Sequence, residues 1–561
     1  MFISIDTEST GLEESDRPFC ATISGQGFDV YTENPEEARS LVHSANGLYL
    51  QNTKFDARML SHWGIDVFKR PTYDCAFMSR ILRNDHLQYS LSAQAKRQGM
   101  EKSTAVDAAL KAGNHYEQRR DYFGRPYKVP RYDKIDRNIL RQYAILDSKI
   151  TYNLGTYYHT VADANDRVVM DMESRLTPVC YAMERRGVML NREYTLRGMY
   201  HEKALLDGYK KQWKDRTGAD FVNSAKSVSK HIAASLPLTD DSNPSLTDDV
   251  IEELLPTVSE GDKERLLLVR NIRTYDKRIS TYYESYLNKA GLVDDVVHPT
   301  MWQAGTRTGR FSYSDPNLQN IPKEEDSVEP FVIRGCFRPR LGYSFISFDY
   351  SQMEYRMLAD YAGEMDVINA VVAGKDFHQV TADMFGVTRK MAKTINFAIL
   401  YGAGDAKLAL MLGISVQEAR RLKDKYFMAL PKVERLVNDI ISVGRGRGFV
   451  NNWIGRKLYA DKEHCYALPN HLIQGGGADV VKLAMIQIAD YLKGKDVHMV
   501  LQIHDQLIFE YPNGMDMTYA RGIKEIMENV YISKSGKMKL TVDCSVSGNS
   551  IAERDMRKVA L

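Results

Sequence analysis

The stretch Phe345-Ile-Ser-Phe-Asp349-Tyr-Ser-Gln-Met-Glu354-Tyr-Arg356 decides how the rest of the chain can be interpreted. Its first residues form a short apolar run that predicts a β-strand, and Asp349 stands where the run ends. Beyond Ser351, apolar residues recur at helical spacing and predict a helix: Met353, Met357, Leu358 and Tyr361. A single Asp at a strand end is most often a helix cap or a turn residue. Other parts of the chain favour a different interpretation of Asp349.

The first of these is a segment ahead of Asp349 that is rich in guanidinium and amide groups. It comprises Thr306-Arg-Thr-Gly-Arg310-Phe-Ser312 and Asp315-Pro-Asn317-Leu-Gln319-Asn320-Ile-Pro322. Such groups can contact the minor-groove acceptors that all base pairs share, and so test the shape of a base pair without reading its sequence. The pattern favours a contact with nucleic acid over a plain loop.

The second is Arg389-Lys-Met-Ala-Lys393-Thr-Ile-Asn396-Phe397-Ala-Ile-Leu-Tyr401-Gly402, where Thr388 is the predicted helix cap. Arg389, Lys393, Phe397 and Tyr401 are each four residues apart, so they form one slanting stripe on an α-helix. A basic surface helix would not explain why two aromatic rings continue the basic stripe. Two cations followed by two rings suit an incoming nucleotide, with the charges at its triphosphate and a ring against its base.

The third is Leu501-Gln-Ile-His504-Asp505-Gln-Leu-Ile-Phe509-Glu510. Residues 499–503 and 507–511 predict two strands joined by a turn at His504-Asp505-Gln506. A polar hairpin tip explains Asp505 equally well on its own, because Asp is common in turns. Paired with Asp349, Asp505 would become the second carboxylate of a two-metal site for phosphoryl transfer.

The N-terminal third carries a separate ordered set of carboxylates. Asp6 and Glu8 lie two residues apart on a predicted strand and therefore project from one face. Asp56 lies on a helix for which Asn52 is the predicted cap, and Tyr143 and Asp147 lie one helical turn apart. Tyr143 and Asp147 alone are more often a surface pair. Together, four carboxylates are what a site needs to hold two divalent ions.

The motifs of residues 180–561 closely resemble those of the family A DNA polymerases, and the first 160 residues resemble the DEDDy class of 3′→5′ exonucleases. The resemblance implies a multidomain α/β and α+β fold, in which an RNase H-like exonuclease domain precedes a right-hand polymerase domain. The expected parts are the exonuclease (1–160), the thumb and linking helices (161–300), the first part of the palm (301–360), the fingers (361–445) and the second part of the palm (446–561).

The resemblance also assigns roles to residues of the polymerase half. Asp349 and Asp505 would be metal ligands, Lys393 would also protonate the leaving pyrophosphate, and Glu354 would exclude a ribose 2′-hydroxyl. The residues expected at the dNTP are Arg389, Lys393, Phe397, Tyr401, His378, Gln352 and Glu354. The residues expected at the DNA are Arg310, Asn317, Gln319, Asn320, Arg356, Asn470, Gln474 and His504. Gln506 stands where many members have Glu.

In the N-terminal third, the resemblance implies that Asp6, Glu8, Asp56 and Asp147 bind metal and that Tyr143 orients the attacking water. The expected cofactor is Mg²⁺, two ions in each site, with Mn²⁺ as a substitute. The chain begins at this domain without a preceding 5′-nuclease domain, which makes it more similar to phage replicative polymerases than to bacterial repair enzymes.

Composition sets limits on these interpretations. The 561 residues, with 43% apolar and 26% charged, are typical of a globular protein of several domains. The six cysteines are scattered without a Cys-x-x-Cys pair, which argues against a disulfide or zinc framework. The sequence shows neither an apolar run long enough for a membrane span nor a signal peptide, so we expect a cytoplasmic protein, in the bacterial host if phage-encoded.

The sequence therefore predicts a DNA-directed DNA polymerase with 3′→5′ proofreading that acts on primer-template DNA and dNTPs, in phage DNA replication. The alternatives are a repair polymerase, or a 3′→5′ DNA exonuclease whose polymerase half only binds DNA. A single-subunit RNA polymerase is disfavoured by Glu354 and Phe397, and a reverse transcriptase by His504-Asp505 in place of a paired-Asp turn. A helicase, primase or processivity factor cannot be identified from the sequence.

Overall fold

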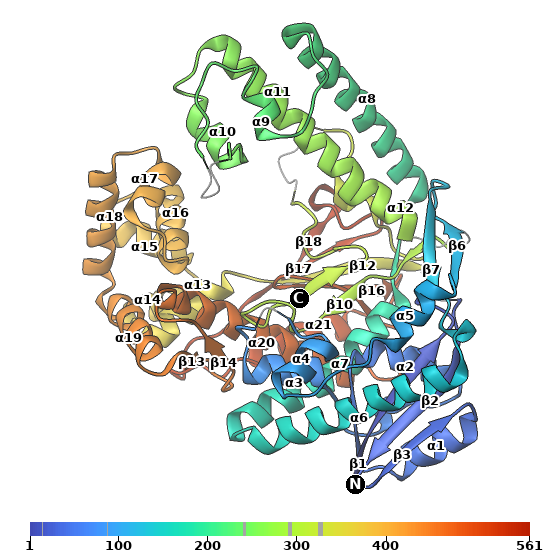
Figure 1. The fold of residues 1–561 in the computed structure, drawn as a ribbon. Helices are drawn as coiled ribbons and strands as arrows, with labels where there is room; N and C mark the ends of the chain where they lie inside the picture. The colour runs from blue at the N-terminus through green and yellow to red at the C-terminus, as the bar shows by residue number, and fades with distance from the viewer. Residues whose placement is uncertain (14, 87, 239–242, 290–293, 324–328) are drawn as a thin grey trace.

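The computed structural model describes residues 1–561 except 14, 87, 239–242, 290–293 and 324–328 (Figure 1). An α/β region at the N-terminus lies below a second sheet, and two groups of helices rise on either side of that second sheet (Figure 1). In the part of the chain that the structure describes, no helix is both long enough and apolar enough to cross a membrane.

The N-terminal region is built on a 5-stranded sheet in the order β3-β2-β1-β4-β5. Strand β1 pairs antiparallel with β2 and parallel with β4. The strands are β1 (Phe2–Ser9), β2 (Pro18–Gly25), β3 (Phe28–Thr32), β4 (Gly47–Leu50) and β5 (Thr72–Asp74). The helices are α1 (Pro35–Ser44), α2 (Thr53–Ser61), α3 (Cys75–Leu82), α4 (Leu91–Arg97), α5 (Ala105–Ala112) and α6 (Arg137–Val161).

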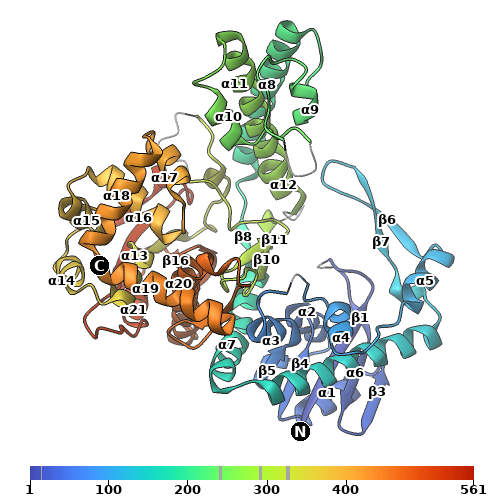
Figure 2. The ribbon, with the colours of Figure 1, turned by 60° about the vertical axis from the view of Figure 1, so that its left-hand side comes forward.

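A hairpin of β6 (Tyr116–Arg120) and β7 (Pro126–Pro130) projects from this region towards the helices above (Figure 2). Asn52, predicted to cap α2, does not do so: its φ is 63° and its side chain accepts no bond from the helix. The first amide of the helix, at Thr53, instead donates to Asp74 at 2.7 Å. A carboxylate on the neighbouring strand thus replaces the expected local cap.

Helix α7 (Ala164–Arg186) connects the two halves of the chain. Gly187, with φ of 62°, ends α7, and the strand β8 (Val188–Met189) follows before α8 (Arg192–Thr217). In the buried middle of α7, Glu173 accepts hydrogen bonds from Arg456 and Lys482 at 2.5 Å each. These ion pairs fix α7 against the second half of the chain.

We call the helices α8 to α12 the thumb helices. They rise above the second sheet, and the β6–β7 hairpin lies at their base in both views (Figures 1 and 2). Arg125 of the hairpin loop lies 3.3 Å from Glu284 at this base. The remaining thumb helices are α9 (Ala225–Val228), α10 (Asp248–Leu254), α11 (Glu260–Lys277), a π-helical turn (Arg278–Glu284) and α12 (Ser285–Lys289).

We call the second 5-stranded sheet, in the order β15-β16-β12-β17-β18, the palm sheet. Its central strand β12 (Tyr343–Tyr350) is antiparallel to both neighbours. Phe345 and Phe348 are fully buried, as expected of the apolar run that defined this strand. The other strands are β15 (His498–Ile503), β16 (Gln506–Pro512), β17 (Val542–Ser547) and β18 (Arg557–Val559). The predicted hairpin around Asp505 is confirmed, since β15 and β16 pair directly.

The remaining elements surround the palm sheet. We call α14 to α18 the fingers helices; they stand opposite the thumb helices (Figure 1). They are α14 (Met365–Val372), α15 (Phe377–Phe385), α16 (Arg389–Leu400), α17 (Asp405–Leu412) and α18 (Val416–Ala429). The others are β9 (Val296–Val297), β10 (Thr300–Trp302), β11 (Ser312–Ser314), α13 (Met353–Ala362), α19 (Pro431–Arg447), β13 (Phe449–Asn451), β14 (Lys457–Tyr459), α20 (Leu468–Tyr491) and α21 (Thr518–Asn529). Thr388 caps α16 as predicted.

Candidate active sites

Two carboxylates that lie more than 150 residues apart in the chain meet at one end of the palm sheet. Asp349, near the end of β12, is in register with Gln506 of β16, and the amide of Tyr350 donates to the carbonyl of Asp505 at 3.4 Å. Burial and the neighbouring charge of Asp349 raise the pKa of Asp505 to about 7. Burial likewise raises the pKa of Asp349. The shift at Asp505 has the direction expected when a second carboxylate lies close by.

The chemistry of this pair fits a hard divalent cation. The buried oxygen Oδ1 of Asp349 has no hydrogen-bond partner among the described residues. The ammonium of Lys323 lies 3.7 Å from its Oδ2. Among the residues that the structure describes, no three His, Cys, Asp or Glu side chains are grouped so that they alone could enclose an ion. Mg²⁺ does not require such a cage, because one or two carboxylates suffice when substrate phosphates and water complete its shell.

A third carboxylate in this region was missed from the sequence. Asp543 of β17 is in register with Asp349 on the side opposite Gln506. Residues directly opposite one another on antiparallel strands project from the same face, and like charges in such positions repel. The Asp543 charge contributes to the raised pKa of Asp349. The register could be known only once the strand pairing was known.

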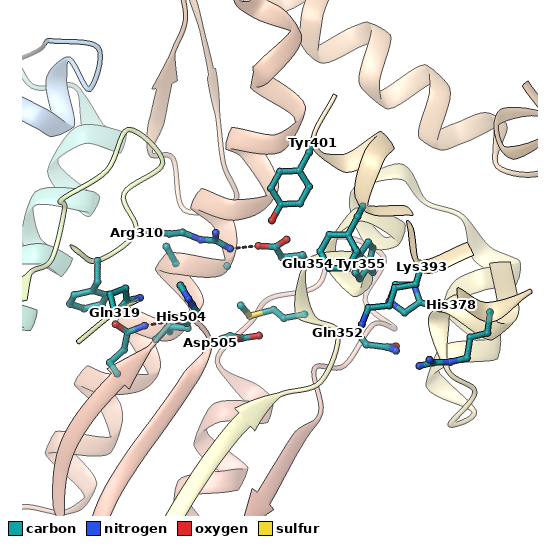
Figure 3. Close-up of a pocket in the computed structure, with 18 residues that line it drawn as sticks. Arg310, Gln319, Gln352, Glu354, Tyr355, His378, Lys393, Tyr401, His504 and Asp505 are labelled. Carbon is teal, nitrogen blue, oxygen red and sulfur yellow. Dashed lines mark hydrogen bonds and ion pairs between the residues drawn. The ribbon is translucent and has the colours of Figure 1, made fainter. Parts of the chain in front are cut away.

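A cavity of about 490 Å³ opens beside Asp505 (Figure 3). All the residues predicted to contact the dNTP line it, namely Gln352, Glu354, His378, Arg389, Lys393, Phe397 and Tyr401. They come from the start of α13, from α15 and from α16. Lining residues to which the sequence analysis gave no role at the site include Phe311, Met353, Tyr355, Gly477, Ala478, Val481 and Gln502. Apart from Gln502 these are apolar, aromatic or small residues, for which the sequence pattern carries no distinguishing signal.

Glu354 and Arg310 form an ion pair across this cavity (Figure 3). Burial raises the pKa of Glu354, and the neighbouring guanidinium opposes the shift. The side chain of Glu354 is 15% exposed and that of Arg310 is 31% exposed. Arg310 was predicted to contact DNA, whereas here its guanidinium holds the predicted gate residue in place.

The far end of the cavity carries the basic end of the predicted stripe. Arg389 binds both carboxylate oxygens of Asp376, at 3.0 and 2.8 Å. This hydrogen bonding lowers the pKa of Asp376 to about 2. Gln352, in the left-handed conformation with φ of 53°, donates to the same carboxylate at 2.5 Å. Asp376 therefore holds both Arg389 and Gln352 at the rim of the cavity.

His378 is oriented by a residue that the sequence analysis did not single out. The Thr381 hydroxyl can donate only to backbone carbonyls of its own helix, at 3.1 Å and 3.2 Å, so it accepts from the Asn396 amide at 2.9 Å. The same amide nitrogen lies 2.9 Å from Nδ1 of His378. Nδ1 therefore accepts, and Nε2 carries the proton. Burial lowers the pKa of His378 to about 4, so this ring is neutral.

Comparison with known proteins agrees with this geometry. A family model described as DNA polymerase family A matches residues 202–552. The chain belongs to DNA polymerase family A.

Several curated members of this family are similar to the chain. DNA polymerase I of Borreliella burgdorferi is 27% identical over 94% of this chain, and the chain spans 60% of that protein's length. DNA polymerase DpoZ of Salmonella phage PMBT28 is 26% identical over 94% of the chain and 93% of its own length. The thermostable DNA polymerase I of Thermus aquaticus is 35% identical over 46% of the chain and 34% of its own length.

A solved structure supports the fold over nearly the whole chain. The POL domain of Pol1 from M. smegmatis, in complex with DNA primer-template and dNTP, has a TM-score of 0.81 and 21% sequence identity. The match covers 98% of this chain and 95% of that one. The family A model begins at residue 202, so the first 201 residues lie outside it.

Some of the residues expected at the DNA are open to a ligand in this structure, and others are buried and bonded within the protein. His504 and Gln319 line the cavity with Arg310, while Asn317 and Asn320 are exposed and Asn470 and Gln474 lie on α20. Arg356 is 7% exposed and donates to the carbonyls of Ser351 and Lys539 at 3.0 and 3.1 Å. Gln319 is 6% exposed, and with its amide suitably oriented it accepts from the His504 amide at 2.9 Å. These two residues support the Asp505 hairpin and α13, and we do not propose them as DNA contacts.

The carboxylates of the N-terminal region also converge. Asp6 and Glu8 lie on β1, Asp56 on α2 and Asp147 on α6. Burial and the charge of Asp147 raise the pKa of Asp6 to about 7. The pKa of Glu8 is raised by burial and then by Asp6 and Asp147, and that of Asp56 by burial and Asp6. The amide and hydroxyl of Thr7 donate to Asp56 at 3.0 and 2.6 Å and fix its orientation.

The N-terminal carboxylates are oxygen donors of the kind that divalent ions prefer. Among the described residues, however, no three of these side chains are grouped so that they alone could enclose an ion, and the ammonium of Lys102 lies beside Asp147. The buried oxygen Oδ1 of Asp147 has no hydrogen-bond partner among the described residues. Lys102 lies 2.6 Å from the other oxygen of Asp147 and 5.0 Å from the centre of the Tyr143 ring. Lys102 belongs to the segment before α5 and had no signal in the sequence, since it stands far along the chain from Asp6, Glu8, Asp56 and Asp147.

Proposed function

We propose that the chain is a template-directed DNA polymerase that adds dNTPs to a primer 3′-hydroxyl, and that its N-terminal region removes nucleotides from a primer 3′ end. The observation that carries the proposal is the meeting of Asp349 and Asp505 beside a cavity lined by every residue expected at the dNTP. Family membership supports the polymerase activity. The likeness to a phage polymerase over 93% of its length supports a role in phage DNA replication.

Different side chains of the cavity would contact different parts of the nucleotide. Arg389 and Lys393 supply two cations at one end, and the neutral His378 supplies an Nε2–H donor between them and the aromatic residues. Phe397 and Tyr401, whose rings are 6.0 Å apart and nearly parallel, offer stacking surfaces for the base. Glu354, held by Arg310, occupies space that a ribose 2′-hydroxyl would need. Lys393, which lines the same cavity, would give a proton to the departing pyrophosphate.

Asp349 and Asp505 would hold two Mg²⁺ ions in the loaded enzyme. Ions held there would lower the pKa of the primer 3′-hydroxyl and neutralise charge on the triphosphate. The chain's own contribution is a fixed pair of carboxylates at the edge of a rigid sheet, which places the hydroxyl and the α-phosphate without reorganisation. Mn²⁺ would substitute, because it accepts the same oxygen ligands.

The second activity rests on Asp6, Glu8, Asp56 and Asp147 as metal ligands and on Tyr143 as the group that orients water. The convergence of four carboxylates from β1, α2 and α6 supports it. Burial and the charge of Asp147 raise the pKa of Tyr143, so its hydroxyl stays protonated and able to donate or accept at neutral pH. A polymerase that edits in this way would shorten a mispaired primer before extending it.

A primer-extension assay tests both activities in one experiment. A labelled primer annealed to a longer template is incubated with Mg²⁺ and with dNTPs, with rNTPs, or without nucleotides. We expect extension with dNTPs alone and shortening when no nucleotide is present. Asp6→Ala combined with Glu8→Ala should extend the primer but not shorten it. If that variant still digests the primer, the nuclease site lies elsewhere, and if wild type extends nothing, the polymerase proposal is wrong.

A further inference from the structure

The end of helix α3 in the N-terminal region lies directly against a polymerase loop. Arg80, on the last turn of α3, donates to the carbonyl of Gly305 at 3.1 Å. Asn84, two residues beyond the helix, donates its amide to the carbonyl of Arg307 at 2.5 Å. Both acceptors belong to the turn between β10 and β11, which we call the 305–310 turn.

The side chain of Asn84 makes two hydrogen bonds to the polymerase half, one as donor and one as acceptor. Its side-chain nitrogen donates to the 305–310 turn, and its side-chain oxygen accepts from the Tyr459 amide of β14 at 3.0 Å. The residue is 5% exposed. A buried amide with both ends occupied holds its two partners at a fixed separation, because losing either bond leaves a buried polar group unsatisfied. Asn84 therefore ties the 305–310 turn to β14.

The 305–310 turn is tight and presents two guanidinium groups. The amide of Gly309 donates to Thr306 at 3.1 Å, and Gly309 has φ of 82°, which an L side chain rarely adopts. Arg307 is exposed at the turn, whereas Arg310 reaches into the cavity and pairs with Glu354. The backbone of Arg307 is thus held by the N-terminal region, while its side chain is free to meet a phosphate of bound DNA.

We propose that Asn84 and Arg80 are positioning residues for the polymerase: the nuclease region fixes the 305–310 turn so that Arg307 is presented to primer-template DNA while Arg310 keeps its pairing with Glu354. This inference rests on the proposed polymerase function of the same site. The N-terminal region is then a structural part of the DNA-binding surface as well as a separate site.

The test uses Asn84→Ala in the full chain, with Asn34→Ala as the matched control. Asn34 also lies in the N-terminal region and caps α1, where its side chain accepts from Glu36 at 3.0 Å, and none of its recorded contacts reaches the polymerase half. Both substitutions remove the amide of an Asn that hydrogen-bonds to backbone. The readouts are the Kd for labelled primer-template by fluorescence anisotropy, kcat and KM for extension, and shortening of single-stranded DNA.

We expect Asn84→Ala to raise the primer-template Kd by about 10-fold, the effect of roughly 1.4 kcal/mol, since two buried hydrogen bonds are lost. The value of kcat at saturating DNA should change less than about 2-fold, and single-strand shortening should match wild type, because Asn84 touches neither set of carboxylates. Hydrogen exchange should accelerate in peptides covering 303–312. Asn34→Ala should leave all these values at the wild-type level.

A double-mutant cycle separates positioning from general destabilisation. If Asn84 acts through the 305–310 turn, Arg307→Ala and Asn84→Ala will be non-additive in primer-template affinity. Additive effects, or an Asn84→Ala protein with wild-type Kd, would overturn the inference. If Asn84→Ala does not fold, Arg80→Leu, which removes the bond to Gly305, replaces it with the same expectations. Wild-type protein that extends no primer would contradict the proposed function instead, which keeps the two failures distinct.

Discussion

Glu354 contributes both its volume and its charge to the cavity, and two substitutions separate these contributions. Glu354→Ala removes the carboxylate that fills the space expected for a ribose 2′-hydroxyl, and leaves Arg310 without its partner. Forcing an extra group into filled space costs about 1–3 kcal/mol. The structure therefore predicts that Glu354→Ala raises the ratio of kcat/KM for rNTPs to that for dNTPs by roughly 5- to 150-fold.

Glu354→Gln is the matched control, because it keeps the volume and removes the charge. The ion pair is partly buried, so its loss should cost at least the roughly 0.2–1 kcal/mol of an exposed pair. That loss lowers kcat/KM for dNTPs by at least about 1.4- to 5-fold, while the rNTP-to-dNTP ratio stays within about 3-fold of wild type. Single-nucleotide insertion kinetics with matched dNTP and rNTP pairs measure both ratios. An unchanged ratio in Glu354→Ala, or equal loss of discrimination in both variants, would refute a steric gate at this position.

The remaining predictions address catalysis, proofreading, pH and stability. Asp349→Asn and Asp505→Asn should each reduce primer extension by more than roughly 100-fold and leave primer shortening intact; substantial residual extension would contradict their assignment. Asp6→Ala combined with Glu8→Ala should have the opposite effect, in that extension is kept and shortening is lost. On a mispaired primer, this variant should fail to remove the mispaired nucleotide before extension. Burial sets the pKa of His378 at about 4, below the usual 6.5, so the folded state binds fewer protons than the unfolded chain between these values. The contribution of His378 to stability is complete above pH 6.5 and declines as the pH falls through that window. When the free energy of unfolding is measured in urea at pH 7 and at pH 4.5, the decrease between the two pH values should therefore be smaller for His378→Asn than for wild type. Equal decreases would contradict the lowered pKa. Lys482→Met should lower the free energy of unfolding by about 3 kcal/mol, because it removes one of the two cations that neutralise the buried Glu173, and denaturation within error of wild type would show that the network is dispensable.

Local patterns predicted the elements that carry the polymerase site. The apolar run before Asp349, the four-residue spacing from Arg389 to Tyr401 and the hairpin around Asp505 each indicate one element by periodicity alone. Helix caps were less predictable, because a cap depends on which group is nearest in space. Thr388 caps α16 as expected, while Asp74 from a neighbouring strand takes the place of Asn52 at α2.

Apart from the grouping of the carboxylates that the family resemblance implied, contacts between distant segments could not be predicted. Arg310 and Gln319 carry groups suited to DNA, yet they pair with Glu354 and the His504 amide inside the protein. Only strand register and tertiary packing bring three further residues close to the sites, namely Lys102, Asn396 and Asp543. A polar residue type fixes what a side chain can bind, whereas the fold decides which partner it meets.

The most direct test is a crystal structure of the protein with a dideoxy-terminated primer-template, the matching dNTP and Mn²⁺, whose anomalous scattering locates each ion. The account predicts two peaks between the carboxylates of Asp349 and Asp505 and the dNTP phosphates, with the primer end beside them. Ions bound away from both carboxylates, or a dNTP seated outside the cavity lined by Arg389, Lys393 and Phe397, would contradict it.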